Sequence, residues 1–422
     1  MSENKTNVPV RDLTIKQGFK LSKFLVSWEM VLVYILVLIN VVLMSMKPNL
    51  YFAAGTIQSI IQAGMDVCPL VLGMILILML GDIDVSAAST MIFASMATGL
   101  CMDAGMPMIV AVIMAIIAGV ACGAFNGFFV AYMGMPAVIT TISTQMLFRG
   151  IVKIVLDVNV LKNFPAFYTV IGWRNIGPIP VAMALFLLMA VGFWFLLQKS
   201  KFGRTLYIIG NNPTCAEYSG INVKLTKLIV FMIMGAMSGV ASIFFVGRMG
   251  GSVSSTMGTG YEMTAIAICV LGGVSTNGGK GTGKVYGPVI ATFIFTFLTY
   301  TLGLLNVDAN SRKIVTGLIL IIAVLIPNVN KKLLADLKLK FIYKGNKNVE
   351  ALNIKTAAKV KALKEEIAVA KKDASLSDSA KNDKIKKAEE EIAALQKKCK
   401  EQTQIWLAEQ AEDAKKAKER FK

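Results

Sequence analysis

The side chains that could do chemistry in this sequence are few, and most are acids or uncharged polar groups set among apolar residues. The stretch LGDIDVSAAS (80–89) places Asp82 and Asp84 between two apolar segments. A charged acid at the centre of a bilayer costs about 2.5–3.5 kcal/mol, so we expect a break between helices here, with Asp84 starting the second helix. The alternative is a carboxylate pair that couples transport to protons or sodium. The sequence has no histidine, which excludes His-based zinc sites, His proton relays and Ser-His-Asp triads.

Other polar residues in apolar segments could line a passage for a solute. Amides and hydroxyls exchange hydrogen bonds with a polyhydroxylated solute, but they equally bond neighbouring helices in a membrane, and both interpretations stay open. Glu262 follows a Gly-Thr-Gly-Tyr stretch and is expected to start a helix. The full set of path candidates is Asp82, Asp84, Asn126, Thr140, Thr141, Thr144, Gln145 and Glu262.

A glycine-rich stretch resembles a phosphate-binding loop at first sight. GGKGTGK (278–284) fits the first seven positions of G-x-x-x-x-G-K-[ST], but the eighth is Val285, which cannot hold magnesium. Apolar segments flank the stretch closely and leave no room for a nucleotide domain. We predict a tight turn between two membrane elements, and no metal site or cofactor bound by this chain.

The composition indicates that these residues belong to a membrane protein. Hydrophobic residues make up 55% of the 422 residues and charged residues 17%, against about 25% in a soluble protein. A membrane helix needs about 20 apolar residues. We predict an all-α polytopic membrane protein with about ten transmembrane helices, of which 136–156 and 260–273 are partial or re-entrant. The candidate segments are 29–46, 54–80, 86–101, 107–133, 136–156, 179–197, 226–247, 260–273, 285–305 and 312–329.

Small residues are frequent in these segments, as in AGVACGAFNG (118–127). Glycine and alanine allow membrane helices to approach closely, so we expect most of these glycines to serve packing.

The charges divide the chain into three parts and set its orientation. Of the 44 Lys and Arg residues, 20 lie in 1–330 and 24 in 331–422. We therefore predict an N-terminal segment at 1–27, a membrane domain at 28–330 and a Lys-rich soluble tail at 331–422. Basic residues gather in 1–27, in the loop 198–227 and at the start of the tail, which places all three in the cytoplasm. Parts on the same side of the membrane are separated by an even number of crossings. The predicted segments give six crossings between 1–27 and the loop 198–227, and four between that loop and the tail. Nucleic-acid binding is not favoured.

The tail has a helical pattern of its own. Val360, Leu363 and Ile367 step by three and four residues, as does the series from Ile385 to Cys399. This is the a/d spacing of a coiled-coil seam, interrupted by DASLSDSAKND (373–383). We predict two helices, about 351–372 and 380–420, folded as a soluble hairpin or docked on a partner.

The basic loop 198–227 contains the stretch GNNPTCAEYSGINV (210–223). Asn212 can cap a helix, Pro213 suits its first position and Gly220 can end it in a left-handed conformation. The expected helix of about 10 Å is too short to span a bilayer. It could serve as a rigid handle for a cytoplasmic partner, or be a surface turn without one.

Four stretches in order resemble the permease subunits of ribose/galactose/xylose-type ABC importers. GNNPTCAEYSGINV is similar to the family's cytoplasmic coupling segment. GDIDVSAAST (81–90) resembles its Gly-Gly-Ile-Asp-Leu-Ser motif, with Asp82 where glycine is usual. GMPAVITTISTQMLFRG (134–150) and the glycine-rich run 258–293 resemble two further motifs. The resemblance covers roughly 30–330, and the tail at 349–422 is additional to the family.

The resemblance implies a bacterial inner-membrane sugar permease with both termini in the cytoplasm. Two permease chains would form the path, a separate ABC ATPase would hydrolyse ATP, and an extracytoplasmic sugar-binding protein would deliver the sugar. This chain would not be an enzyme. The residues implied to contact the ATPase are Gly210, Asn211, Asn212, Pro213, Cys215, Ala216, Glu217, Ser219, Gly220 and Ile221. The alternatives are an ion-coupled secondary transporter of a small polar solute and a membrane-anchored scaffold acting through its tail.

Overall fold

The computed structural model describes residues 27–276, 278–279 and 285–308, single positions between 311 and 321, and residues 347–372 and 378–420. The chain separates into two compact units, 1–324 and 325–422. The predicted N-terminal segment and most of the predicted helix 312–329 lie outside the described residues.

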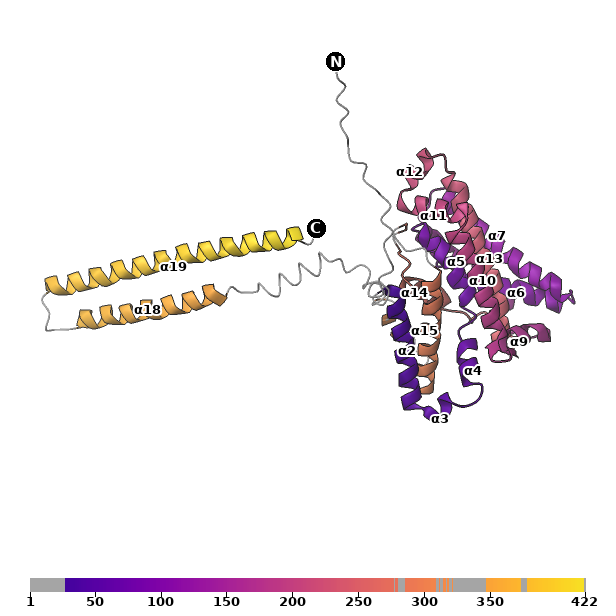
Figure 1. Ribbon diagram of the computed structural model, residues 1–422. Coiled ribbons are helices and arrows are strands. Elements are labelled where there is room, and N and C mark those ends of the chain that lie inside the picture. The colour runs from indigo at the N-terminus through magenta and orange to yellow at the C-terminus, as the bar shows by residue number, and fades with distance from the viewer. Residues whose placement is uncertain are drawn as a thin grey trace, which may run out of the picture. The chain divides into compact units, whose positions relative to one another are not determined.

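The described part of the first unit is mainly helical (Figure 1). It also holds a short antiparallel pair between β1 (Asn175–Ile176) and β2 (Ile179–Pro180) and an isolated bridge between Leu161 and Val253. Among the residues that the structure describes, six helices are long and apolar enough to cross a membrane. They are α2 (Trp28–Met46), α7 (Met108–Ala131), α8 (Ala137–Leu156), α10 (Val181–Gln198), α13 (Val223–Arg248) and α15 (Tyr286–Leu304). The chain is therefore an all-α polytopic membrane protein.

Shorter helices complete the unit. Two of these, α5 and α14, are apolar but too short to span by themselves. Figure 1 shows α11 and α12 at one end of the unit and α3 and α9 at the opposite end. The shorter helices are α3 (Pro48–Tyr51), α4 (Thr56–Gln62), α5 (Cys68–Met79), α6 (Ala87–Asp103), α9 (Ala166–Trp173), α11 (Lys201–Asn211), α12 (Pro213–Tyr218) and α14 (Tyr261–Leu271).

The structure corrects two of the predicted segments. The segment 54–80 is not one helix but two, α4 and α5, because Pro69 begins a new helix after the turn that holds Gly64 and Asp66. The segment 136–156 is not partial or re-entrant. It forms the full span α8, because hydroxyls such as that of Thr144 bond carbonyls of their own helix and do not interrupt it.

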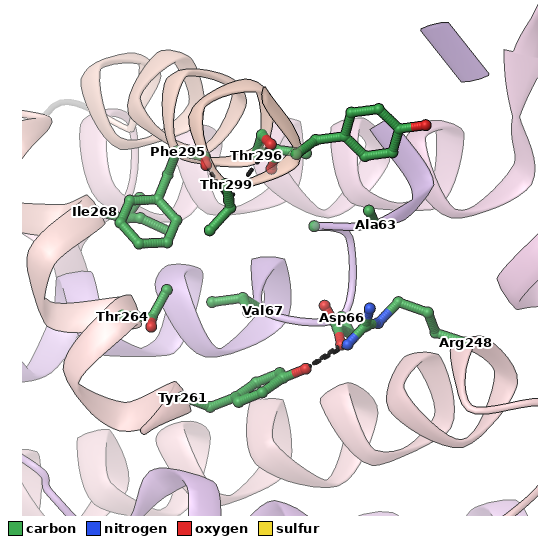
Figure 2. A pocket seen from close by; sticks show the side chains of 12 residues that line it. Ala63, Asp66, Val67, Arg248, Tyr261, Thr264, Ile268, Phe295, Thr296 and Thr299 are labelled. Carbon is green, nitrogen blue, oxygen red and sulfur yellow. Dashed lines mark hydrogen bonds and ion pairs between the residues drawn. The ribbon is translucent and has the colours of Figure 1, made fainter. Parts of the chain in front are cut away.

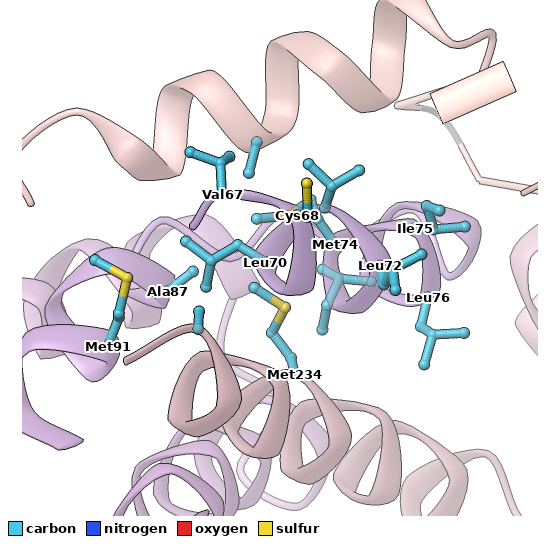
Figure 3. Close-up of a cluster of buried hydrophobic side chains, with 14 of the residues drawn as sticks. Val67, Cys68, Leu70, Leu72, Met74, Ile75, Leu76, Ala87, Met91 and Met234 are labelled. Atoms are coloured by element: carbon cyan, nitrogen blue, oxygen red, sulfur yellow. The ribbon is translucent and has the colours of Figure 1, made fainter. Parts of the chain in front are cut away.

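The core of the unit lies around α5, whose twelve residues are all buried. Apolar side chains cover every face of this helix, as expected of a helix enclosed by others. Figure 3 shows side chains of α5 within this core, with Leu70 on the side of Met91 of α6 and Met234 of α13 beside the helix. The outer helices differ: only 11% of the apolar window of α2 is buried, against 67% for α13. Their exposed apolar side chains suit contact with lipid.

Helices α7 and α13 lie close together, backbone against backbone, and glycines permit this approach. A Cβ atom on Gly123 would lie 2.2 Å from the Phe231 carbonyl oxygen, and one on Gly235 would lie 2.1 Å from the Gly119 carbonyl oxygen. These distances leave no room for a side chain. The packing role predicted for the glycines of 118–127 is confirmed for Gly119, Gly123 and Gly127.

In the second unit, α18 (Lys347–Lys372) and α19 (Asp378–Arg420) pack against each other (Figure 1). Val360, Leu363 and Ile367 of α18 and Ile385, Ile392 and Leu395 of α19 are half-buried rather than exposed.

Substituting Gly235→Ala should destabilise the protein by about 1–3 kcal/mol, the usual cost of overpacking a core, because backbone atoms of α7 cannot move aside for the new methyl group. The measurement is the thermal unfolding midpoint in detergent. Gly192→Ala on α10 is the matched control, since nothing lies within 4 Å of a Cβ atom there. Equal midpoints for the two variants would contradict the proposed close packing.

Candidate functional site

The stretch 210–223 folds locally as the sequence predicts. Asn212 caps α12 by accepting a hydrogen bond from the Cys215 amide (3.1 Å), and Pro213 occupies its first turn. Gly220 has φ +79°, and the Ile221 amide donates to the Ala216 carbonyl (3.1 Å), which closes the helix end. Of the six residues of α12 only Ala216 is buried. The result is a short, rigid and exposed projection at one end of the unit.

The projection formed by residues 210–223 contacts the core through glycines. A Cβ atom on Gly210 would lie 1.9 Å from the Met79 carbonyl oxygen and 2.6 Å from the Gly279 nitrogen. The Gly279 amide donates to the Met79 carbonyl (3.1 Å). The end of α11, the end of α5 and the glycine-rich turn therefore meet backbone against backbone. This contact fits the tight turn predicted for GGKGTGK, whose residues 280–284 lie outside the described residues.

An ion pair adds a second link beside the projection. Lys227 Nζ, one turn into α13, lies 2.8 Å from Asp82 Oδ2 in the connection between α5 and α6. Both side chains are mostly covered, with 21% and 15% of their surface exposed. Asp82 is therefore paired in the described structure, and the pair joins two segments that are 145 residues apart.

The connection between α5 and α6 also holds a buried polar network. Asp84 Oδ1 accepts hydrogen bonds from the Ser86 amide (2.8 Å) and the Ser86 hydroxyl (2.6 Å). Asn126 Nδ2 of α7 donates to Ser86 Oγ (2.7 Å), and Thr141 Oγ1 of α8 accepts from the Val85 amide (3.1 Å). The predicted break between helices is confirmed, but Asp84 does not start the second helix. Helix α6 begins at Ala87 with Ser86 at the N-cap position, and Asp84 accepts both hydrogen bonds of Ser86 from two residues earlier.

A third group of polar contacts joins α8 to the start of α14. Arg149 donates to the carbonyls of Met257 (2.9 Å) and Gly258 (3.1 Å), and Gln145 Nε2 donates to Glu262 Oε1 (3.2 Å). Glu262 lies in the first turn of α14, where the sequence predicts it. Its Oε2 atom is buried without a hydrogen-bond partner among the described residues.

A polar cavity of about 280 Å³ lies where α4 breaks into α5, α13 ends and α14 begins, with α15 on its far side (Figure 2). Arg248 Nε donates to Asp66 Oδ2 (2.6 Å), the Tyr261 hydroxyl donates to the same oxygen (2.8 Å), and Arg248 Nη2 donates to the Tyr261 hydroxyl (2.6 Å). The three side chains form a closed triangle on one wall. Asp66 is only 2% exposed.

The predicted path residues do not meet in one place. Asp84, Asn126 and Thr141 gather around Ser86, Gln145 meets Glu262, and Asp82 pairs with Lys227. Thr140 and Thr144 donate to carbonyls of Pro136 and Thr141. None of the eight lines the cavity of Figure 2, so their role in a path stays a prediction.

Sequence reasoning missed the cavity. Arg248 was not among the candidates, although it ends the apolar run of α13, and Asp66 interrupts another apolar run. An acid and a base, each alone in a membrane segment, indicate a buried pair. Within the described residues, no cluster of three or more His, Cys, Asp or Glu side chains could hold a metal ion.

Comparison with known proteins places the chain among transport permeases. The family described as "Branched-chain amino acid transport system / permease component" matches residues 56–324. The chain is 32% identical to the ribose import permease protein RbsC of Escherichia coli over 301 residues, which is 70% of this chain and 92% of the relative.

Two further relatives give the same result. The D-allose transport system permease protein AlsC of Escherichia coli is 31% identical over 69% of this chain and 89% of its own length. The autoinducer 2 import system permease protein LsrC of Photorhabdus laumondii is 32% identical over 67% and 84%. No solved structure matches the chain.

The Asp82–Lys227 pair should contribute a coupling energy of about 0.5–1 kcal/mol to stability, as expected for a partly exposed ion pair. The measurement is a double-mutant cycle with Asp82→Asn and Lys227→Gln in thermal unfolding. Lys224→Gln replaces Lys227→Gln in the control cycle, because Lys224 is an exposed lysine one turn earlier on the same helix. Additive effects in the first cycle, or equal coupling in both, would contradict the pairing.

Proposed function

The chain belongs to the family of branched-chain amino acid transport system permease components and, within it, to the permeases of monosaccharide ABC importers. From this premise we propose that it forms the translocation path of an ATP-driven sugar importer. We also propose that it couples to a separate ATPase through residues 198–227. The observation that carries the proposal is the family match over residues 56–324, which takes in nearly all of the described helical unit. The relatives are permeases, not enzymes, and we place ATP hydrolysis in another subunit.

The geometry of the projection supports its role as the ATPase contact. A partner that grips α12 holds a helix capped at both ends, so it can transmit force rather than unwind the segment. The backbone contacts of Gly210 and the Asp82–Lys227 pair then carry a displacement to the end of α5 and to α13. We assign this coupling to the residues from Gly210 to Ile221.

The membrane arrangement follows from the same proposal. Ten crossings, counting α4 with α5 as one and α14 as a short one, place the N-terminal segment, α11 with α12, and the tail on the cytoplasmic side of the inner membrane. A second permease chain, identical or related, completes the path, and an extracytoplasmic binding protein delivers the sugar.

An ion-coupled transporter is not favoured. Asp84 is engaged with Ser86, and Asp82 with Lys227, so each carboxylate already serves the fold. The tail lies outside the family match. We propose that α18 and α19 form a soluble helical hairpin that supports the complex without being the transport machinery.

The first test is purification of the full chain from native membranes in mild detergent, followed by identification of the proteins that accompany it. An ABC ATPase at about one copy per permease chain, together with ATP-dependent sugar uptake in vesicles, is the expected result. Absence of any ATPase under conditions that preserve other ABC complexes would refute the proposal.

Substituting Gly220→Val should abolish ATP-driven uptake while the chain still reaches the membrane, because a β-branched residue is strained at φ +79° and the end of α12 would unwind. Gly177→Val is the matched control. Gly177 has φ +61° in an exposed turn between β1 and β2 with nothing near its Cβ position, so it carries the same strain away from α12. Normal uptake by Gly220→Val would count against the coupling role.

Deleting residues 349–422 should leave at least partial sugar uptake, since the family match ends at residue 324. The measurement is uptake in cells that carry the truncated chain, normalised to its amount in the membrane. Complete loss of uptake at a normal amount of protein would instead assign the tail an essential part in transport.

A further inference from the structure

The cavity of Figure 2 has two unlike walls. Asp66, Arg248 and Tyr261 form the polar wall, and Phe295, Thr296 and Thr299 of α15 lie opposite. Thr296 donates its hydroxyl proton to the Thr292 carbonyl (2.8 Å), and Thr299 donates to the Phe295 carbonyl. On the α15 wall Thr296 and Thr299 therefore have no spare donor, while Phe295 offers an aromatic ring and Tyr300 a ring that carries a hydroxyl.

On the polar wall, one hydrogen-bond acceptor and one donor are not used by the described residues. Within the described residues, the hydrogen bonds of Asp66 all end on Oδ2, and Arg248 donates only through Nε and Nη2. Asp66 Oδ1 and Arg248 Nη1 are therefore without a protein partner in that part of the chain. Although Asp66 is only 2% exposed, this carboxylate lies at a cavity rather than in packed side chains (Figure 2), so a ligand in the cavity can donate a hydrogen bond to it.

The charge of this wall favours an uncharged ligand. The carboxylate of Asp66 and the guanidinium of Arg248 cancel, so neither an anion nor a cation gains a net electrostatic attraction that would offset its loss of hydration. A hydroxyl group both donates and accepts a hydrogen bond. Two neighbouring hydroxyls can therefore donate to Asp66 Oδ1 and accept from Arg248 Nη1 without bringing any charge.

The size and the opposite wall narrow the ligand further. Pockets for drug-sized ligands measure roughly 300–1,000 Å³, so a cavity of about 280 Å³ suits a single small ring. The rings of Phe295 and Tyr261 and the side chains of Val67 and Ile268 give the C–H groups of such a ring an apolar surface.

We infer that this cavity is a transit site for one monosaccharide-sized neutral polyol, held through hydroxyls by Asp66 Oδ1 and Arg248 Nη1. This inference rests on the proposed function and places the sugar at a site that the sequence candidates do not include. Tyr261 is a positioning residue, because its hydroxyl fixes both partners of the ion pair. The site lies where α5 and α14 begin, so a shift of either helix alters the cavity.

The test is saturation-transfer NMR on the full permease–ATPase complex in lipid nanodiscs, without the binding protein. The probes are D-ribose and D-allose, with the anion D-ribonate for comparison. We expect transfer to the ring protons of a neutral sugar and little to D-ribonate. Ala63→Leu, which fills the cavity from the end of α4, and Asp66→Asn should each lower the transfer at least fivefold.

Thr292→Val is the matched control: Thr292 is buried in α15 and bonds the Pro288 carbonyl, but does not line the cavity, so it should keep the transfer within twofold. If Ala63→Leu or Asp66→Asn fails to assemble with the ATPase, the Tyr261→Phe variant is measured in its place. We expect it to lower the saturation transfer to the sugar at least threefold.

Three results would overturn the inference: no transfer to either neutral sugar in the unsubstituted complex, unchanged transfer in every assembled cavity variant, or equal transfer to D-ribonate. The proposed function is judged separately by the accompanying ATPase and by ATP-driven uptake. A complex that imports sugar but shows no transfer refutes the cavity alone.

Discussion

The complete burial of α5 is the constraint on which the rest of the structure depends. This helix is too short to cross a bilayer, and the chain breaks out of helical form before and after it. Non-helical backbone at the depth of the bilayer is tolerated only where other parts of the protein bury it or where it lines a water-filled cavity. Neighbouring helices must therefore enclose α5 and both of its ends. The helices that contact it are α10, α11, α13, α14 and α15, and the glycine contact between α7 and α13 lets that shell close tightly.

Each end of α5 is also where charged side chains enter the apolar unit, and each charge there has a partner. At one end Asp66 meets Arg248 and Tyr261. At the other, Asp82 meets Lys227 and Asp84 holds Ser86. Burying an unpaired charge would cost far more than these pairs gain. The pairs therefore allow irregular backbone to persist where a transporter needs polar groups and a surface that can change shape.

The same geometry joins the proposed ATPase contact to the proposed sugar site. The end of α11, from which the capped helix α12 continues, touches the end of α5 through backbone atoms, and the start of α5 borders the cavity. A single buried helix thus lies between the exposed projection and the polar chamber. Close-packed interiors transmit strain, so the packing of α5 on every side suits the transmission of a displacement along its length.

Some features follow from the sequence itself because they depend on neighbouring residues. The apolar runs identify a membrane protein. The short helix α12 follows from its own residues Asn212, Pro213 and Gly220, and the glycines of 118–127 predict a close contact between helices. Tertiary structure alone decided the rest. Pairs such as Asp66 with Arg248 and Asp82 with Lys227 join residues 182 and 145 positions apart, and no local pattern encodes such distances. For the same reason the sequence named Asn126, Thr141 and Gln145 as path candidates, whereas the fold engages them in contacts between helices and forms its polar cavity from other residues.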